Sequence, residues 1–107
     1  MAYTSEAPFQ IRRHIQFLNG VNTETIGGTK QLTVSDSTYQ FLNGGGASRD
    51  IELPGEDDGI YFWIKNTGAS DTLVVKNVAA ATIITLAVGV SALVVCNGAA
   101  WAVMMTA

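Results

Sequence analysis

The sequence predicts an all-β protein: a single β-sandwich or barrel-like domain of about eight or nine short strands behind an extended N-terminal arm. Short runs of β-branched and aromatic residues alternate with turn signals every 8–12 residues or so, which is typical of such folds. No window of 11 or more residues carries an apolar stripe with helical period. The 107 residues suit one domain, which we divide into an arm, residues 1–20, and a β-sandwich, residues 21–107.

The arm comes first. Phe9, Ile11, Ile15 and Phe17 share one parity, interrupted by Arg13, which predicts an amphipathic extended segment or a first strand that enters the domain near Gly20. Further strands are expected from the segments QLTVS (31–35), TYQFL (38–42), RDIEL (49–53), IYFWIKN (60–66) and DTLVVKN (71–77). The last two are apolar on both faces, which indicates a central strand or a strand packed on another subunit.

The segment after Lys76 contains no charge and raises the question of a membrane helix. Such a helix needs about 20 consecutive apolar residues, whereas Gly89, Ser91 and the Asn97-Gly98 pair interrupt this one. The β-branched content favours strands at 81–87, 91–96 and 100–105, with a type I′ turn at Asn97-Gly98. We therefore expect the interior of a sheet here and no membrane.

The tetrapeptide FLNG occurs at 17–20 and again at 41–44, and VCNG at 95–98 ends in the same way. The flanking sequences do not align over the 20 or more residues that a repeat architecture requires. We interpret the three segments as independent strand ends, each followed by an Asn-Gly turn.

Charge and composition limit the classes of function. Charged residues make up only 14% of the chain, which predicts a surface made mostly of Ser, Thr, Asn and Gly, with part of it buried against other chains. The net charge of −3 gives no general attraction to nucleic acid or anionic lipid. The N-terminus lacks the apolar run of a secretory signal, and the single Cys96 permits no internal disulfide. We expect synthesis in a host cytoplasm.

No catalytic, cofactor-binding or metal-binding residues are predicted, and no cofactor is expected. His14 is the only histidine, and no spacing identifies a nucleophile for it. The acidic loop PGEDDG (54–59) lacks the calcium-loop pattern and is interpreted as a solvated turn. Cys96 is expected to be a buried apolar residue.

Two sets of residues are candidates for contact with partners. The first lies in the arm, where apolar residues would pack on a partner protein and arginines would pair with its carboxylates; it comprises Phe9, Ile11, Arg12, Arg13, His14, Ile15 and Phe17. The alternative for this segment is an edge strand with a solvated polar face. The second set, Tyr61, Trp63 and Trp101, comprises candidates for a subunit interface, with core packing and stacking on a sugar as alternatives.

The order of elements then suggests a family. The segments LTVSDSTYQFLNGG, IELP, GIYFWIKNTGASDTLVVKN and TIITLAVGVSALVVCNGAAWAVM follow one another over residues 32–104. This series resembles small structural proteins of tailed bacteriophages. The resemblance implies a non-enzymatic homotrimer that decorates the outer capsid surface of the virion as a cement protein and binds the major capsid protein. Similar domains occur in phage tail and head fibres, so the alternative is a receptor- or glycan-binding tip.

Overall fold

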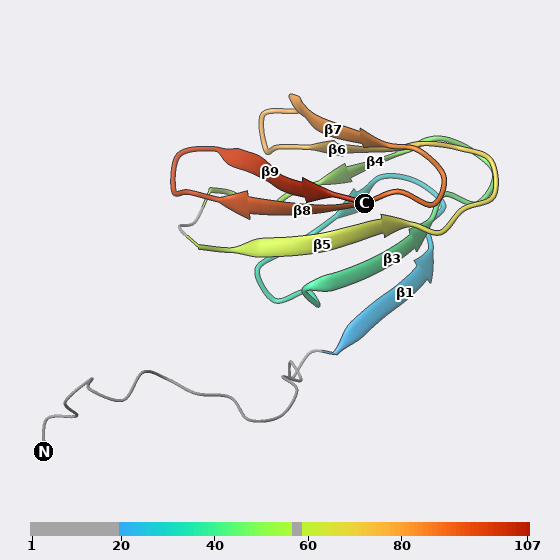
Figure 1. The fold of residues 1–107 in the computed structure, drawn as a ribbon, viewed down its shortest axis with the longest axis horizontal. Helices are drawn as coiled ribbons and strands as arrows, with labels where there is room; N and C mark the ends of the chain where they lie inside the picture. Colours follow the sequence, from blue (N-terminus) through green and yellow to red (C-terminus); the bar gives the residue numbers. More distant parts are fainter. Residues whose placement is uncertain (1–19, 57–58) are drawn as a thin grey trace, which may run out of the picture.

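The structure, a computed structural model, describes residues 20–56 and 59–107, and it confirms the all-β prediction. Nine strands form two sheets in this part of the chain, arranged as two layers (Figure 1). Sheet A has the order β1-β3-β5-β8-β9 and contains β1 (Val21–Thr25), β3 (Tyr39–Asn43), β5 (Tyr61–Asn66), β8 (Ser91–Cys96) and β9 (Trp101–Thr106). Sheet B has the order β2-β4-β6-β7 and contains β2 (Lys30–Gln31), β4 (Arg49–Glu52), β6 (Leu73–Lys76) and β7 (Thr82–Leu86).

The first six strands alternate between the two sheets, so that the chain winds around the core in successive turns. Each turn adds one strand in parallel to each sheet: Tyr39 lies opposite Trp63 in sheet A, and Arg49 lies opposite Leu73 in sheet B. Both pairs are 24 positions apart (39 to 63 and 49 to 73). Parallel neighbours need a long crossover connection, and here that connection is a strand of the opposite sheet.

The winding ends after β6, and the last three strands pair antiparallel. β7 folds back on β6, β8 returns to sheet A beside β5, and β9 pairs with β8. All three strands lie in the uncharged segment after Lys76. No helix in residues 20–56 and 59–107 has the length and apolar character to span a membrane.

Asparagine side chains end four of the strands. Asn43 and Asn66 close β3 and β5, and each side-chain oxygen accepts a hydrogen bond from the N–H two residues later, at 2.8 and 2.9 Å. Asn77 and Asn97 follow β6 and β8 directly and accept from two N–H groups each. A side chain that mimics a backbone turn in this way releases the chain from the ladder. Asn43-Gly44 and Asn97-Gly98 thus end strands as expected, whereas Asn19 of the third predicted Asn-Gly pair lies outside the described residues.

The core lies between the sheets and consists of alternate residues of their strands. The buried apolar side chains are Ile26, Leu32, Leu42, Ile51, Leu53, Phe62, Ile64, Leu73, Val75, Leu86, Ala92, Val94, Cys96 and Trp101. Asn66 is fully buried among them, and its amide donates to the carbonyls of Asp71 (2.8 Å) and Leu86 (3.0 Å). This asparagine therefore ties the central strand of sheet A to β7 of sheet B.

Three local predictions need correction. β1 lies in VNTET, a segment with one apolar residue for which no strand was predicted. The strand predicted at 31–35 is reduced to Lys30–Gln31, since the Asp36 carboxylate accepts a hydrogen bond from the Thr33 N–H (2.6 Å) and forms a turn. The type I′ turn is also wrong: only Gly98 of the pair has positive φ (94°), and the loop from Asn97 to Ala100 has four residues.

Polar side chains close the core at the β1/β2 edge. Buried Gln40 accepts a hydrogen bond from the Asn22 amide (2.8 Å), which also donates to Glu24 (3.1 Å). Lys30 reaches across from sheet B and pairs with Glu24 at 2.9 Å. Hydrogen bonding to Lys30, then to Asn22, holds the pKa of Glu24 below its usual value of 4.5.

Replacing Asn66 by alanine should destabilise the fold strongly, because two carbonyls lose their donor and one N–H its acceptor. We expect Asn66→Ala to lower the free energy of unfolding by about 3 kcal/mol, measured by urea denaturation at constant protein concentration. The matched control is Asn43→Ala, which gives up the hydrogen bond from Gly45 at a half-buried position and should cost about 1 kcal/mol. Equal losses would contradict the linking role of Asn66.

Glu24 should make stability depend on pH. Because its folded pKa is lowered, the carboxylate contributes stability above its unfolded pKa of 4.5, and this contribution is lost as the pH falls through the folded pKa. The difference in unfolding free energy between the unaltered protein and Glu24→Gln should therefore shrink as the pH is lowered from about 6 to about 3. The difference in unfolding free energy between the unaltered protein and Lys30→Gln should shrink over the same pH range, because this variant lacks the group that lowers the pKa of Glu24 most. A difference that stays constant over this range would refute the assignment.

Candidate interaction surface

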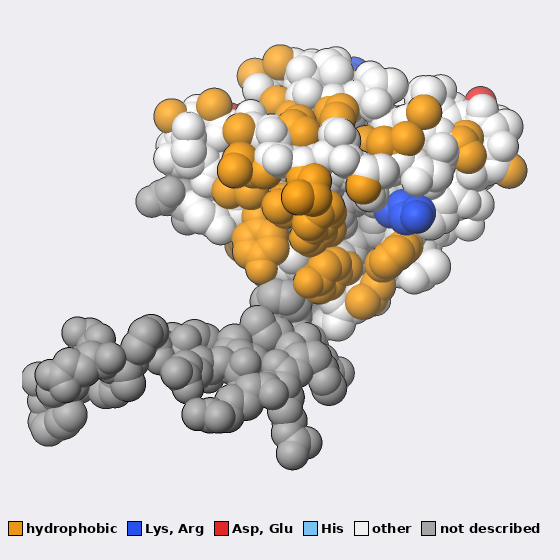
Figure 2. Space-filling model, in the orientation of Figure 1, with side chains coloured by type: hydrophobic (Ala, Val, Ile, Leu, Met, Phe, Trp, Pro, Cys, Tyr) orange, Lys and Arg blue, Asp and Glu red, His pale blue; other side chains and the backbone are white. Residues whose placement is uncertain are grey.

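The outer face of sheet A is lined by apolar and aromatic side chains. Burial alternates along the strands, so that the residues between the core positions point away from sheet B. These outward residues are Tyr39, Phe41, Tyr61, Trp63, Leu93, Val95 and Met105. Hydrophobic side chains gather over β3, β5, β8 and β9 in the space-filling view (Figure 2). We call this set of seven residues the aromatic face.

The outer face of sheet B differs in kind. Alternation there places Asp50, Glu52 and Lys76 outward, and Lys76 pairs with Asp50 at 2.9 Å. In the described part of sheet A, the one charged side chain on the outer face is Lys65, near the end of β5. One side of the sandwich is thus suited to water and the other to contact with apolar groups.

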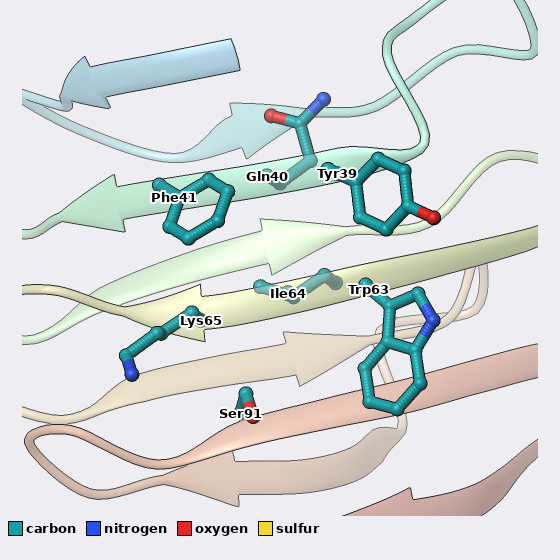
Figure 3. Close-up of a pocket in the computed structure, with 7 residues that line it drawn as sticks. All are labelled: Tyr39, Gln40, Phe41, Trp63, Ile64, Lys65 and Ser91. Atoms are coloured by element: carbon teal, nitrogen blue, oxygen red, sulfur yellow. The ribbon is translucent and has the colours of Figure 1, made fainter. Parts of the chain in front are cut away.

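A shallow hollow of about 170 Å³ lies within the aromatic face. Tyr39 of β3 lies opposite Trp63 of β5, and Phe41 lies opposite Lys65, which has Ser91 on its other side. Figure 3 shows these side chains around the hollow, together with Gln40 and Ile64 of the same strands. The lining offers three aromatic rings, those of Tyr39, Phe41 and Trp63, together with the Lys65 cation and the hydroxyl groups of Tyr39 and Ser91.

β9 forms one edge of sheet A and continues the aromatic face. Val103, Met104 and Met105 are 37%, 64% and 55% exposed, although β9 lies in a paired sheet. The strand contains no charged residue and no proline, the usual protection of an edge strand. The register shift between Leu93 and Val94 on β8 is the one irregularity that interrupts its pairing.

The structure separates the predicted interface residues. Tyr61 and Trp63 lie on the outer face of β5, where they are accessible to a partner. Trp101 does not: it is 6% exposed, its ring stacks at a tilt on Phe62 with centroids 6.1 Å apart, and its Nε1 donates to the Pro54 carbonyl. Burial in the chain's own core removes Trp101 from the interface candidates. Phe9, Ile11, Arg12, Arg13, His14, Ile15 and Phe17 lie outside the described residues.

Sequence reasoning missed most of the aromatic face. Tyr39, Phe41, Leu93, Val95 and Met105 were not singled out. Phe41, Leu93 and Val95 each lie between two buried positions of their strands, and pairing with Trp63 and Leu93 places Tyr39 and Met105 on the same face. Alternation alone could have found them, because a strand that is apolar at both parities must expose one set or bury it elsewhere.

The described residues offer little reactive chemistry. In residues 20–56 and 59–107, no three or more His, Cys, Asp or Glu side chains are grouped so that they could hold a metal ion. Cys96 is 1% exposed, and its sulfur accepts a hydrogen bond from the Gly98 N–H at 3.4 Å.

Comparisons with models of protein families, with curated proteins and with solved structures find no match to this chain.

Proposed function

We propose that the chain is a non-enzymatic structural protein of a bacteriophage virion: a trimeric decoration protein that binds the major capsid protein and stabilises the assembled head. The sequence resemblance over residues 32–104 suggests the family. The observation that carries the proposal is the contrast between the aromatic face and the charged outer face of sheet B. A protein built for assembly needs one apolar surface for its own copies and one polar surface for water.

Trimerisation would serve capsid binding in two ways. A protein that binds only the assembled lattice stabilises that lattice by linkage. Three linked copies bind with avidity, so weak contacts per chain add to firm attachment. In this proposal the aromatic face holds the copies together, while the arm, with Phe9, Ile11, Arg12, Arg13, His14, Ile15 and Phe17, reaches the capsid.

The hollow beside Trp63 favours one alternative, a glycan-binding tip of a phage fibre. Aromatic rings such as Tyr39 and Trp63 suit the apolar faces of sugars, and Lys65 and Ser91 add polar contacts. A saturable change of tryptophan fluorescence on titration with sugars would favour this alternative over a decoration protein.

A charge placed on the aromatic face should prevent self-association. We expect the unaltered chain to sediment as a trimer and Leu93→Glu, at the outward position opposite Trp63, to sediment as a monomer with unchanged circular dichroism. The carboxylate would be buried without a partner in the interface, which is costly.

The matched control is Val74→Glu, at an outward position in the middle of sheet B beside Asp50. This variant should remain a trimer. Dissociation by Val74→Glu, or a trimeric Leu93→Glu, would place the subunit contact elsewhere.

Deletion of residues 1–18 tests the role of the arm. We expect a trimer of unchanged thermal stability that no longer cosediments with capsids. Arg12→Ala/Arg13→Ala in the full chain should weaken cosedimentation by about tenfold or more, since paired arginines are among the stronger contacts at such interfaces. Full capsid binding by the truncated chain would mean that the arm is not the docking element.

A further inference from the structure

We propose that three copies join with their aromatic faces toward a common axis parallel to the strands, so that β9 of each copy lies beside β1 of the next. This inference rests on the proposed function for the number of copies and goes beyond it by specifying their arrangement. The occupant of the aromatic face is thus a second and a third copy of this chain.

Strand direction permits this closure. β1, β3 and β5 are parallel, β8 runs opposite to them, and β9 is antiparallel to β8, so β1 and β9 point the same way. Rotation about an axis parallel to the strands preserves direction. β9 of one copy and β1 of the next would therefore be parallel neighbours, and the contact would close as a ring. A two-fold pairing of β9 with itself would place the two strands antiparallel.

The width of the sheet fits a three-sided prism. Five strands spaced by about 4.8 Å, with one more spacing between copies, give sides of about 24 Å. The centre of each side then lies about 7 Å from the axis, against the roughly 5 Å that is half the usual spacing of packed sheets. Large side chains at the middle of the face span the difference, and Tyr61 and Trp63 stand there on β5.

The area of the face favours a ring over a stacked pair. Strands of about 17–20 Å give the face a projected area of only about 400 Å². A standard interface buries about 800 Å² per partner, so the face alone falls short. A ring also covers both edges of sheet A, including Met104 and Met105 of β9 and Val21 of β1, which are all more than half exposed.

Lys65 is compatible with this arrangement because it is the last residue but one of β5. Its three copies would emerge near one end of the prism, where water reaches the ammonium groups, and not at the centre of the apolar contact.

Cysteine cross-linking tests the arrangement directly. Pairing places Val21, Tyr39, Trp63, Leu93 and Met105 in one row across sheet A. Rotation about an axis parallel to the strands keeps the level of this row, so Met105 would lie beside Val21 of the next copy, with Thr23 two residues further along β1. Val21, Thr23 and Met105 are all exposed on the outer face. The variant Val21→Cys/Met105→Cys, or Thr23→Cys/Met105→Cys, treated with a short bismaleimide should form covalent dimers and trimers and nothing larger. Native Cys96 is buried and should not react.

The single variants Val21→Cys, Thr23→Cys and Met105→Cys should stay monomeric in denaturing electrophoresis, as should the control pair Gln31→Cys/Thr82→Cys at the two edges of sheet B. If Met105→Cys alone forms covalent dimers, the copies pair two-fold through their β9 edges and do not form the ring. A ladder beyond trimer would indicate an open chain of copies. Either result, or no cross-link in both double variants, overturns the inference.

The same proteins separate this inference from the proposed function. A trimer that binds capsids but gives no β1–β9 cross-link refutes the arrangement and leaves the function standing. A cross-linked trimer that fails to cosediment with capsids refutes the function and leaves the arrangement standing.

Discussion

Sheet A is apolar on both sides, and sheet B is the one further layer in the described part of the chain that can cover it. Sheet B covers the side with Leu42, Phe62, Ile64 and Val94. The other side keeps the aromatic face, whose burial in a well-packed contact is worth about 25 cal/mol for each Å² of apolar surface removed from water. The contact between copies that we propose follows from this imbalance, and so does the low charge of the sequence.

The winding of the chain explains how so short a sequence builds this sheet. By alternating between layers, each turn of chain lengthens both sheets at once, and asparagine side chains end the strands where the chain must cross. Asn66 then fixes the spacing of the layers through its bonds to Asp71 and Leu86. The antiparallel strands β7 to β9 stop the winding, leaving β9 as an apolar edge. The aromatic face and the exposed edge strand β9 thus both result from the order in which the strands join sheet A.

The sequence predicted the class of fold and most strands well, because alternation and turn residues are local signals. Prediction from the sequence was wrong where the structure of a segment depends on residues far away in the chain. β1 is a strand because VNTET pairs with β3, and Trp101 is buried because Pro54, 47 positions away, accepts its N–H. The winding itself left a trace: the similar segments NGGGAS (43–48) and NTGAS (66–70) both carry the chain out of sheet A.

The native mass of the unaltered chain, by light scattering after size exclusion without detergent, tests most directly whether the aromatic face is buried between copies. The account predicts about 34 kDa, three chains of 11.3 kDa, constant over a wide range of protein concentration. A monomer that persists at high concentration, with the aromatic face open to water, would contradict it.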